Sequence, residues 1–274
     1  SVPFIGHMRK PAALGFKTGG DSYDARRPGY TDESVDLIVS EIIATSEAAK
    51  TRDLKYDVLE LASGTGKLTE SLSMKLPSHM KYLATEPSEN FLKILKSKVL
   101  NVDVAMATAD SIPLVDNAVG SVVCAHSFHW FSGMENLKSI HNVLIPGGKL
   151  ILIWNMKQFG HGWMSAFYEQ RQEVVKRIGG SLNDLFNTMQ WRKDIDTSED
   201  FKLLWHKSLA GVKFQGDIEK VLSHLTAVSY NLLPAVERDA YAHQLRQILI
   251  NWPGLDLNNI TVPYTTELYV FIAQ

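Results

Sequence analysis

An acidic residue, a pair of glycines and a second acidic residue follow one another at a spacing that suits a nucleotide-type cofactor. Glu60 stands shortly before Gly64 and Gly66, and Glu86 follows about twenty residues later. The glycines permit a tight turn and a close approach of the backbone to a ligand. A dinucleotide site normally shows a third glycine, but Thr69 occupies that position. A carboxylate beside the turn would repel a diphosphate and attract a sulfonium or an ammonium, so the pattern favours a cationic cofactor.

This turn needs a strand before it and a helix behind it. The apolar run that contains Val58, Leu59 and Leu61 suits a strand buried on both faces. Leucines at 68, 72 and 76 recur at the helical period directly after the turn. A helix N-terminus offers free backbone amides, so strand, turn and helix together form a cradle for a ligand.

The rest of the first half of the chain repeats this alternation of strand and helix. Strands are predicted at about 56–61, 81–85, 102–107, 119–125 and 149–155, and helices after Thr31 and at about 67–76, 88–98 and 134–144. A late helix near Pro234 and a closing strand at about 264–273 follow. Such alternation predicts an α/β fold with a parallel sheet, in which ligands bind at the carboxyl ends of the strands.

Composition argues for a globular protein and against several other classes. The chain has 274 residues, 45% of them hydrophobic, and a net charge of −2 without a basic block, so we expect no nucleic-acid partner. Residues 1–10 contain no apolar core of the length found in signal peptides, and no run is long and apolar enough to cross a bilayer, so we expect a cytoplasmic protein without a membrane partner. Cys124 is the only cysteine, which excludes an intrachain disulfide. We expect a monomer or a weak homodimer.

At this point the chain resembles the class I methyltransferases that depend on S-adenosyl-L-methionine. The matching segments are Glu-Leu-Ala-Ser-Gly-Thr-Gly at 60–66, Glu86, Ala-Asp-Ser-Ile at 109–112, His-Trp-Phe at 129–131 and Leu-Ile-Pro-Gly-Gly at 144–148. Upstream, Phe16, Tyr23, Arg27, Pro28 and Tyr30 are similar to an N-terminal segment of the type-11 branch, which includes trans-aconitate and thiol methyltransferases. The resemblance covers residues 16–155 well and the remainder loosely.

The resemblance implies a cofactor site and a product, S-adenosyl-L-homocysteine. Glu60 and the backbone of the glycine turn would hold the methionine moiety, Glu86 the ribose, and Asp110 with Ile112 the adenine. The full set of residues that we expect to bind the cofactor is Tyr23, Arg27, Glu60, Ala62, Gly64, Thr65, Gly66, Glu86, Asp110, Ser111, Ile112 and His126. No metal is expected, because the histidines show no metal-ligand spacing.

The acceptor side is less specific. His129 is the candidate catalytic residue, either as an acid-base group or by orienting the acceptor. Substrate contacts are expected from Trp130, Trp154, Trp163 and Phe167. Basic residues at Arg171, Arg177, Arg192 and Lys193 could clamp a carboxylate or be ordinary solvated helix charges. Aromatic residues in the same region would also suit a thiol or a phenol.

We therefore expect a Rossmann-like, mostly parallel seven-stranded sheet with helices on both faces and a helical lid. The whole of 1–274 is predicted to be one domain, with an N-terminal segment (1–30), a cofactor core (31–155), a helical lid or substrate wall (156–205) and a C-terminal completion of the sheet (206–274). The predicted activity is methyl transfer to a small-molecule acceptor, with O- or S-methylation of a carboxylate or thiol favoured. A non-catalytic binding protein and an NAD-dependent oxidoreductase remain alternatives.

Overall fold

The computed structural model describes residues 28–160, 162–177, 186–226 and 233–274. Seven strands in this part of the chain form one sheet in the order β3-β2-β1-β4-β5-β7-β6. The strands are β1 (Tyr56–Leu61), β2 (Tyr82–Thr85), β3 (Asp103–Ala105), β4 (Val119–Ala125), β5 (Leu144–Lys157), β6 (Phe201–Gly216) and β7 (Ile260–Ala273). The predicted seven-stranded α/β architecture is therefore confirmed.

Helices connect most of these strands. They are α3 (Asp32–Ala48), α4 (Lys67–Lys75), α5 (Glu89–Lys98), the short 3-10 helix η1 (Phe128–Trp130), α6 (Met134–Val143), α7 (Trp163–Arg177), α8 (Gln190–Ser198), α9 (Ile218–Thr226) and α11 (Ala235–Ile250). Within the described ranges, no helix combines the length and the apolar character that a membrane span requires.

The sheet is parallel through its first five strands. Central strand β1 pairs in parallel with β2 on one side, where Glu60 lies opposite Ala84, and with β4 on the other side. Strand β7 is antiparallel to β5. Asn155, near the end of β5, bonds to Thr266, whereas Gln158, just after β5, bonds to Pro263, which is earlier in the chain than Thr266. Because β1, β2 and β4 are parallel, their carboxyl ends lie at the same end of the sheet.

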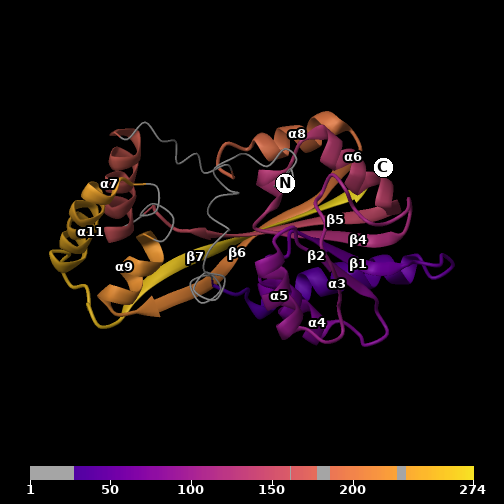
Figure 1. Cartoon of the computed structure of the whole chain (residues 1–274), viewed down its shortest axis with the longest axis horizontal. Helices are drawn as coiled ribbons and strands as arrows, with labels where there is room; N and C mark the ends of the chain where they lie inside the picture. Colours follow the sequence, from indigo (N-terminus) through magenta and orange to yellow (C-terminus); the bar gives the residue numbers. More distant parts are fainter. Residues whose placement is uncertain (1–27, 161, 178–185, 227–232) are drawn as a thin grey trace. The chain divides into compact units, whose positions relative to one another are not determined.

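The described residues of 28–155, 186–209 and 266–274 belong to a first compact unit. Figure 1 shows α3, α4 and α5 on one face of its sheet and α6 and α8 on the other. Helix α3 begins where the Thr31 side chain accepts a hydrogen bond from the Ser34 backbone, and it buries Val35 and Ile38 completely or nearly so. Cys124 is wholly buried in β4. This unit carries all the predicted strand-end motifs.

The described residues of 156–177, 210–226 and 233–265 form a second compact unit. Helices α7, α9 and α11 gather beside the part of β6 and β7 that belongs to it (Figure 1), and α11 packs against both α7 and α9. The unit has its own apolar core, to which Trp163, Phe167 and Leu245 contribute. The described residues thus divide into two compact units, and β5, β6 and β7 each contribute residues to both. The expectation of a single domain stays a prediction.

The boundaries of the expected lid also change. We expected residues 156–205 to be aromatic-rich helices, but Phe201 and Trp205 lie on β6. There Phe201, Leu203 and Trp205 turn inward while Lys202 and Leu204 are exposed, which is the two-residue period of a strand. Helix α8 belongs to the first unit and α7 to the second.

Candidate active site

The turn at residues 63–66 joins β1 to α4 through two glycines with positive φ. Gly64 has φ +60° and Gly66 has φ +86°. The Gly66 amide donates to the Ser63 carbonyl at 3.0 Å, which closes the turn. A Cβ at Gly64 would meet no atom within 4 Å, whereas a Cβ at Gly66 would lie 2.5 Å from the Leu95 side chain. A side chain at Gly66 would therefore have to displace the Leu95 side chain, whereas Gly64 faces open space that a ligand can occupy.

Glu86 closes the other side of this turn. It follows β2, is 5% exposed, and its carboxylate accepts hydrogen bonds from the Gly64 amide at 2.9 Å and the Ser88 amide at 2.8 Å. Burial raises the pKa of Glu86 to about 7, against the lowering effect of these two amides. Each carboxylate oxygen has a further lone pair, so Glu86 still has capacity to accept hydrogen bonds from ribose hydroxyls.

Glu60 lies beneath the turn, with no exposed surface. Its Oε2 accepts hydrogen bonds from Thr69 at 2.7 Å and from the Tyr82 hydroxyl, while its buried Oε1 has no hydrogen-bond partner among the described residues. Burial raises the pKa of Glu60 to about 7, although the bonds from Tyr82 and Thr69 oppose the change. Because Glu60 is wholly buried and bonded to Thr69 and Tyr82, its position favours a structural role next to the turn over direct contact with the methionine moiety.

The predicted adenine segment lies at the carboxyl end of β3. The Glu86 amide donates to Ala105 at the end of that strand, at 3.2 Å, which brings the segment next to the glycine turn. Asp110 is exposed and accepts a hydrogen bond from the Thr108 hydroxyl, and the Ser111 amide donates to the Thr108 carbonyl at 3.2 Å. These bonds fold the segment into a compact turn. Ile112 is half-buried within it.

The two histidines after β4 differ in how they are held. His126 has φ +55°, and its amide donates to the Ile153 carbonyl at 2.7 Å, so its backbone is tied to β5. His129 lies on η1, and its Nδ1 accepts a hydrogen bond from the indole Nε1–H of Trp154 at 2.8 Å. Trp130 is half-buried, with its ring centroid 5.0 Å from that of His129. All three follow a strand that ends beside the glycine turn.

An aromatic cluster stands behind this loop. Trp154 is wholly buried, with its ring centroid 4.7 Å from that of Trp191 on α8. The same helix accepts a hydrogen bond at Asp194 from Ser132, 2.6 Å away. Sequence reasoning did not single out Ser132 and Asp194, because only the fold brings residues so distant in the chain together.

The other predicted residues fall in three groups. Tyr23 and Arg27 lie outside the described residues. Trp163 and Phe167 are buried in the core of the second unit, a placement that favours a packing role over substrate contact. Ala62 has φ +53° and Thr65 is buried, both within or beside the glycine turn.

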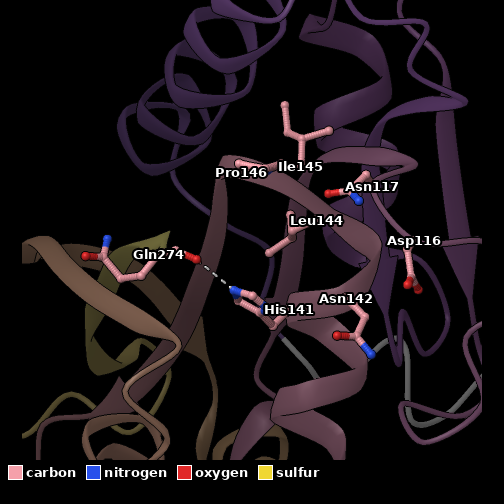
Figure 2. Close-up of a pocket in the computed structure, with 8 residues that line it drawn as sticks. All are labelled: Asp116, Asn117, His141, Asn142, Leu144, Ile145, Pro146 and Gln274. Carbon is pink, nitrogen blue, oxygen red and sulfur yellow. Dashed lines mark hydrogen bonds between the residues drawn. The ribbon is translucent and has the colours of Figure 1, made fainter.

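A pocket of about 140 Å³ lies at the other end of the strands, away from the glycine turn (Figure 2). Its lining residues are Asp116, Asn117, His141, Asn142, Leu144, Ile145, Pro146 and Gln274. Asp116 and Asn117 precede β4, and Leu144 begins β5, so the pocket lies at the amino ends of these strands. It is therefore not the site that the glycine turn forms.

The part of the chain that contains this site matches a known protein family. Residues 59–152 match the type-11 methyltransferase model, described as a methyltransferase domain. The chain carries a class I methyltransferase domain. An uncharacterized methyltransferase of Schizosaccharomyces pombe is 29% identical to this methyltransferase over 260 residues, which cover 92% of this chain and 96% of the relative. One from Mycobacterium tuberculosis is 28% identical over 259 residues, 94% of this chain and 95% of the relative.

A solved structure agrees on the fold of the methyltransferase. A type II methyltransferase candidate from Anaeromyxobacter dehalogenans superposes with a TM-score of 0.57 at 14% identity, over 89% of this chain and 97% of that one. The cofactor is S-adenosylmethionine, as the family indicates. The open space at Gly64 and the lone pairs left on Glu86 fit such a group. None of these matches specifies the acceptor.

Proposed function

We propose that this methyltransferase transfers a methyl group from S-adenosylmethionine to oxygen or sulfur of a small molecule, with a carboxylate or a thiol as the acceptor. The observation that carries the proposal is the position of His129. It follows β4, the strand that pairs with β1, and β1 leads into the glycine turn. The indole Nε1–H of Trp154 donates to His129 Nδ1 at 2.8 Å and fixes the imidazole ring. A histidine so held can orient an acceptor atom.

Residues of the first unit would bind the donor. Glu86 would accept hydrogen bonds from the ribose hydroxyls, the turn at Gly64 would admit the methionine moiety, and the segment from Asp110 to Ile112 would border the adenine. The bound cofactor supplies an electrophilic methyl group on a sulfonium. Because this group is intrinsically reactive, the protein needs mainly to align the acceptor and exclude water, and such alignment can contribute about 7–11 kcal/mol.

A carboxylate or a thiolate suits such a site because it needs no strong base. The basic residues around α8 offer limited support for a clamp. Arg192 pairs with Asp196 at 2.9 Å and lies over the Phe271 ring at 5.1 Å, so its guanidinium already has two partners. We therefore rest the proposal on His129 and not on a carboxylate clamp at Arg192. The net charge of −2 without a basic block agrees with a small acceptor and not a nucleic acid.

The test is incubation of the purified chain with methyl-labelled S-adenosylmethionine and a panel of small carboxylates, thiols, phenols and amines. We expect label in a carboxylate or thiol, and strong loss of product with His129→Ala. Label only in amines or phenols would contradict the proposed acceptor class. Calorimetric titration with S-adenosylmethionine and, in parallel, with NADH identifies the cofactor independently, and binding of NADH alone would contradict methyl transfer altogether.

A further inference from the structure

We infer that Trp154 is a positioning residue that holds His129 as the neutral tautomer with its proton on Nε2. His129 then offers the methyl acceptor a hydrogen-bond donor and not a base. The inference rests on the proposed function for its consequence, but the tautomer itself can be observed without any acceptor.

The geometry of the pair defines the roles of donor and acceptor. An indole nitrogen can only donate a hydrogen bond, and the Trp154 Nε1–H lies 2.8 Å from His129 Nδ1. His129 Nδ1 must therefore accept, which requires a lone pair on that nitrogen. In a neutral imidazole the proton then resides on Nε2.

Packing makes this arrangement difficult to change. Trp154 is wholly buried, and its ring centroid lies 4.7 Å from that of Trp191 and 4.9 Å from that of Phe186. A Tyr269 ring meets it edge-on at 6.0 Å. The indole cannot turn its N–H away without displacing these rings, because interiors are close-packed.

Protonation of His129 would place two N–H groups against each other. A proton on Nδ1 would meet the Trp154 N–H and leave that buried donor without an acceptor, which is unfavourable because the donor cannot regain a hydrogen bond from water. For His129 to act as a base through Nε2, the ring would need that same proton on Nδ1. His126 is a titratable neighbour of His129, and the centroids of the two imidazole rings are 6.0 Å apart.

The reaction that fits this tautomer passes no proton to His129. The acceptor's own electron pair forms the bond to the methyl carbon, and the electrons of the carbon–sulfur bond move to sulfur. An ionised acceptor then gives a neutral product and a thioether, so charge and atoms balance without a base. The Nε2–H would hold the acceptor in line, which selects acceptors that arrive already deprotonated.

Nitrogen-15 NMR of histidine-labelled protein near pH 7.5 tests the tautomer directly. Subtraction of the His129→Gln spectrum assigns the signals of His129. We expect a protonated Nε2 and an unprotonated Nδ1 in the native protein, and a substantial population of the Nδ1–H form in Trp154→Phe. Trp191→Phe is the matched control: it also removes a buried indole N–H from the cluster, but one that donates to the Phe186 carbonyl at 3.2 Å.

Three outcomes decide the inference. A proton on Nδ1 in the native protein overturns it, and so does an unchanged tautomer in Trp154→Phe. An equal change in Trp191→Phe would show that general loosening of the cluster is the cause, which also overturns it. If Trp154→Phe does not fold, the native spectrum alone still decides whether Nδ1 is protonated.

A kinetic comparison tests the donor role with any acceptor that is methylated. His129→Gln keeps an N–H donor and has no basic nitrogen, so we expect it to retain most of kcat, whereas loss of the hydrogen bond itself would lower kcat by about tenfold or more. His129→Ala should lose more. A glutamine variant as inactive as the alanine variant would overturn the donor role. If no acceptor is ever methylated, the proposed function fails while the NMR result stands by itself.

Discussion

Two buried carboxyl groups near the glycine turn, Glu60 on β1 and Glu86 after β2, have raised pKa values. Burial raises the pKa of both Glu60 and Glu86 to about 7. Glu86 is the group that would accept the ribose hydroxyls, and only its ionised form offers all its lone pairs to them. Donor binding and proton release are therefore coupled at this residue.

We predict that affinity for S-adenosylmethionine rises with pH. Below a pKa of about 7, each pH unit costs up to about tenfold in the ionised fraction, so binding at pH 8 should exceed binding at pH 6 by roughly tenfold. Isothermal titration calorimetry across this range measures the effect. Glu86→Gln should bind more weakly and show a flatter pH dependence, and an equally steep profile in that variant would contradict the assignment.

The stability of the unliganded protein should change with pH in the opposite direction. Glu60 keeps its proton up to about pH 7 in the folded state, whereas an unfolded glutamate loses it near the ordinary glutamate pKa of 4.5. The folded state thus binds more protons in this window, and its free energy of unfolding falls as pH rises, by roughly 3 kcal/mol for this group. Urea unfolding should show a shallower fall for Glu60→Gln, and identical slopes would disprove the effect.

The two glycines of the turn should respond differently to alanine. At Gly64 a Cβ would point into open space, so Gly64→Ala should cost only about 1 kcal/mol of stability, from its positive φ, but should obstruct the donor. At Gly66 the Cβ would meet Leu95 at 2.5 Å, so Gly66→Ala should destabilise the fold more. Thermal unfolding and donor titration of both variants check this contrast, and equal effects on stability would contradict it.

Among the elements, β5 and β7 are joined by a buried side-chain pair. Asn155 accepts from the Thr266 hydroxyl at 2.8 Å and donates to the Gly29 carbonyl at 2.8 Å. Asn155→Ala would leave the wholly buried Thr266 hydroxyl without this partner, so we expect a loss of about 2 kcal/mol in urea unfolding. Tyr56→Phe, which removes an exposed bond to Asp103, is the control and should cost under about 1 kcal/mol. Equal losses would contradict the argument.

The strands that sequence predicts best are those buried on both faces. β1 and β4 have the predicted bounds, 56–61 and 119–125, because each contains wholly buried apolar residues, Val58 and Leu59 in β1 and Val122 and Val123 in β4. β5 begins at Leu144, earlier than the predicted 149, since Pro146 and Gly147 look like a turn but remain within the strand. β6 is an edge strand with lysine and histidine among its aromatic residues, and this mixture hides its alternation.

The candidate site was predictable in position but not in detail. Residues after β1, β2, β3 and β4 could be assigned to one edge, because parallel strands end together. The bond between Trp154 and His129 could not, since it depends on the neighbouring positions of β4 and β5 and on the rotation of two rings. In the same way, the burial of Glu60 beneath Thr69 and Tyr82 depends on packing that no spacing reports.

At the scale of the whole molecule, the second unit has a core of its own. Phe167 is wholly buried in it, so Phe167→Ala should lower the free energy of unfolding by about 3–5 kcal/mol. The glycine turn and Glu86 belong to the first unit, so donor affinity below the unfolding transition should be unchanged. Circular dichroism and calorimetry measure the two quantities. Loss of donor binding in a folded variant would instead support the substrate-side role predicted for Phe167.

The single thiol of the chain has a practical consequence. Cys124 is wholly buried in the middle of the first unit's sheet, and burial, with the nearby charge of Glu60, raises its pKa well above the usual range. Alkylating reagents attack thiolates, so the native fold shields Cys124 both by access and by charge state. The rate at which a maleimide modifies Cys124 therefore reports how often the interior of the protein opens. The label would react with unfolded chains and not with folded ones.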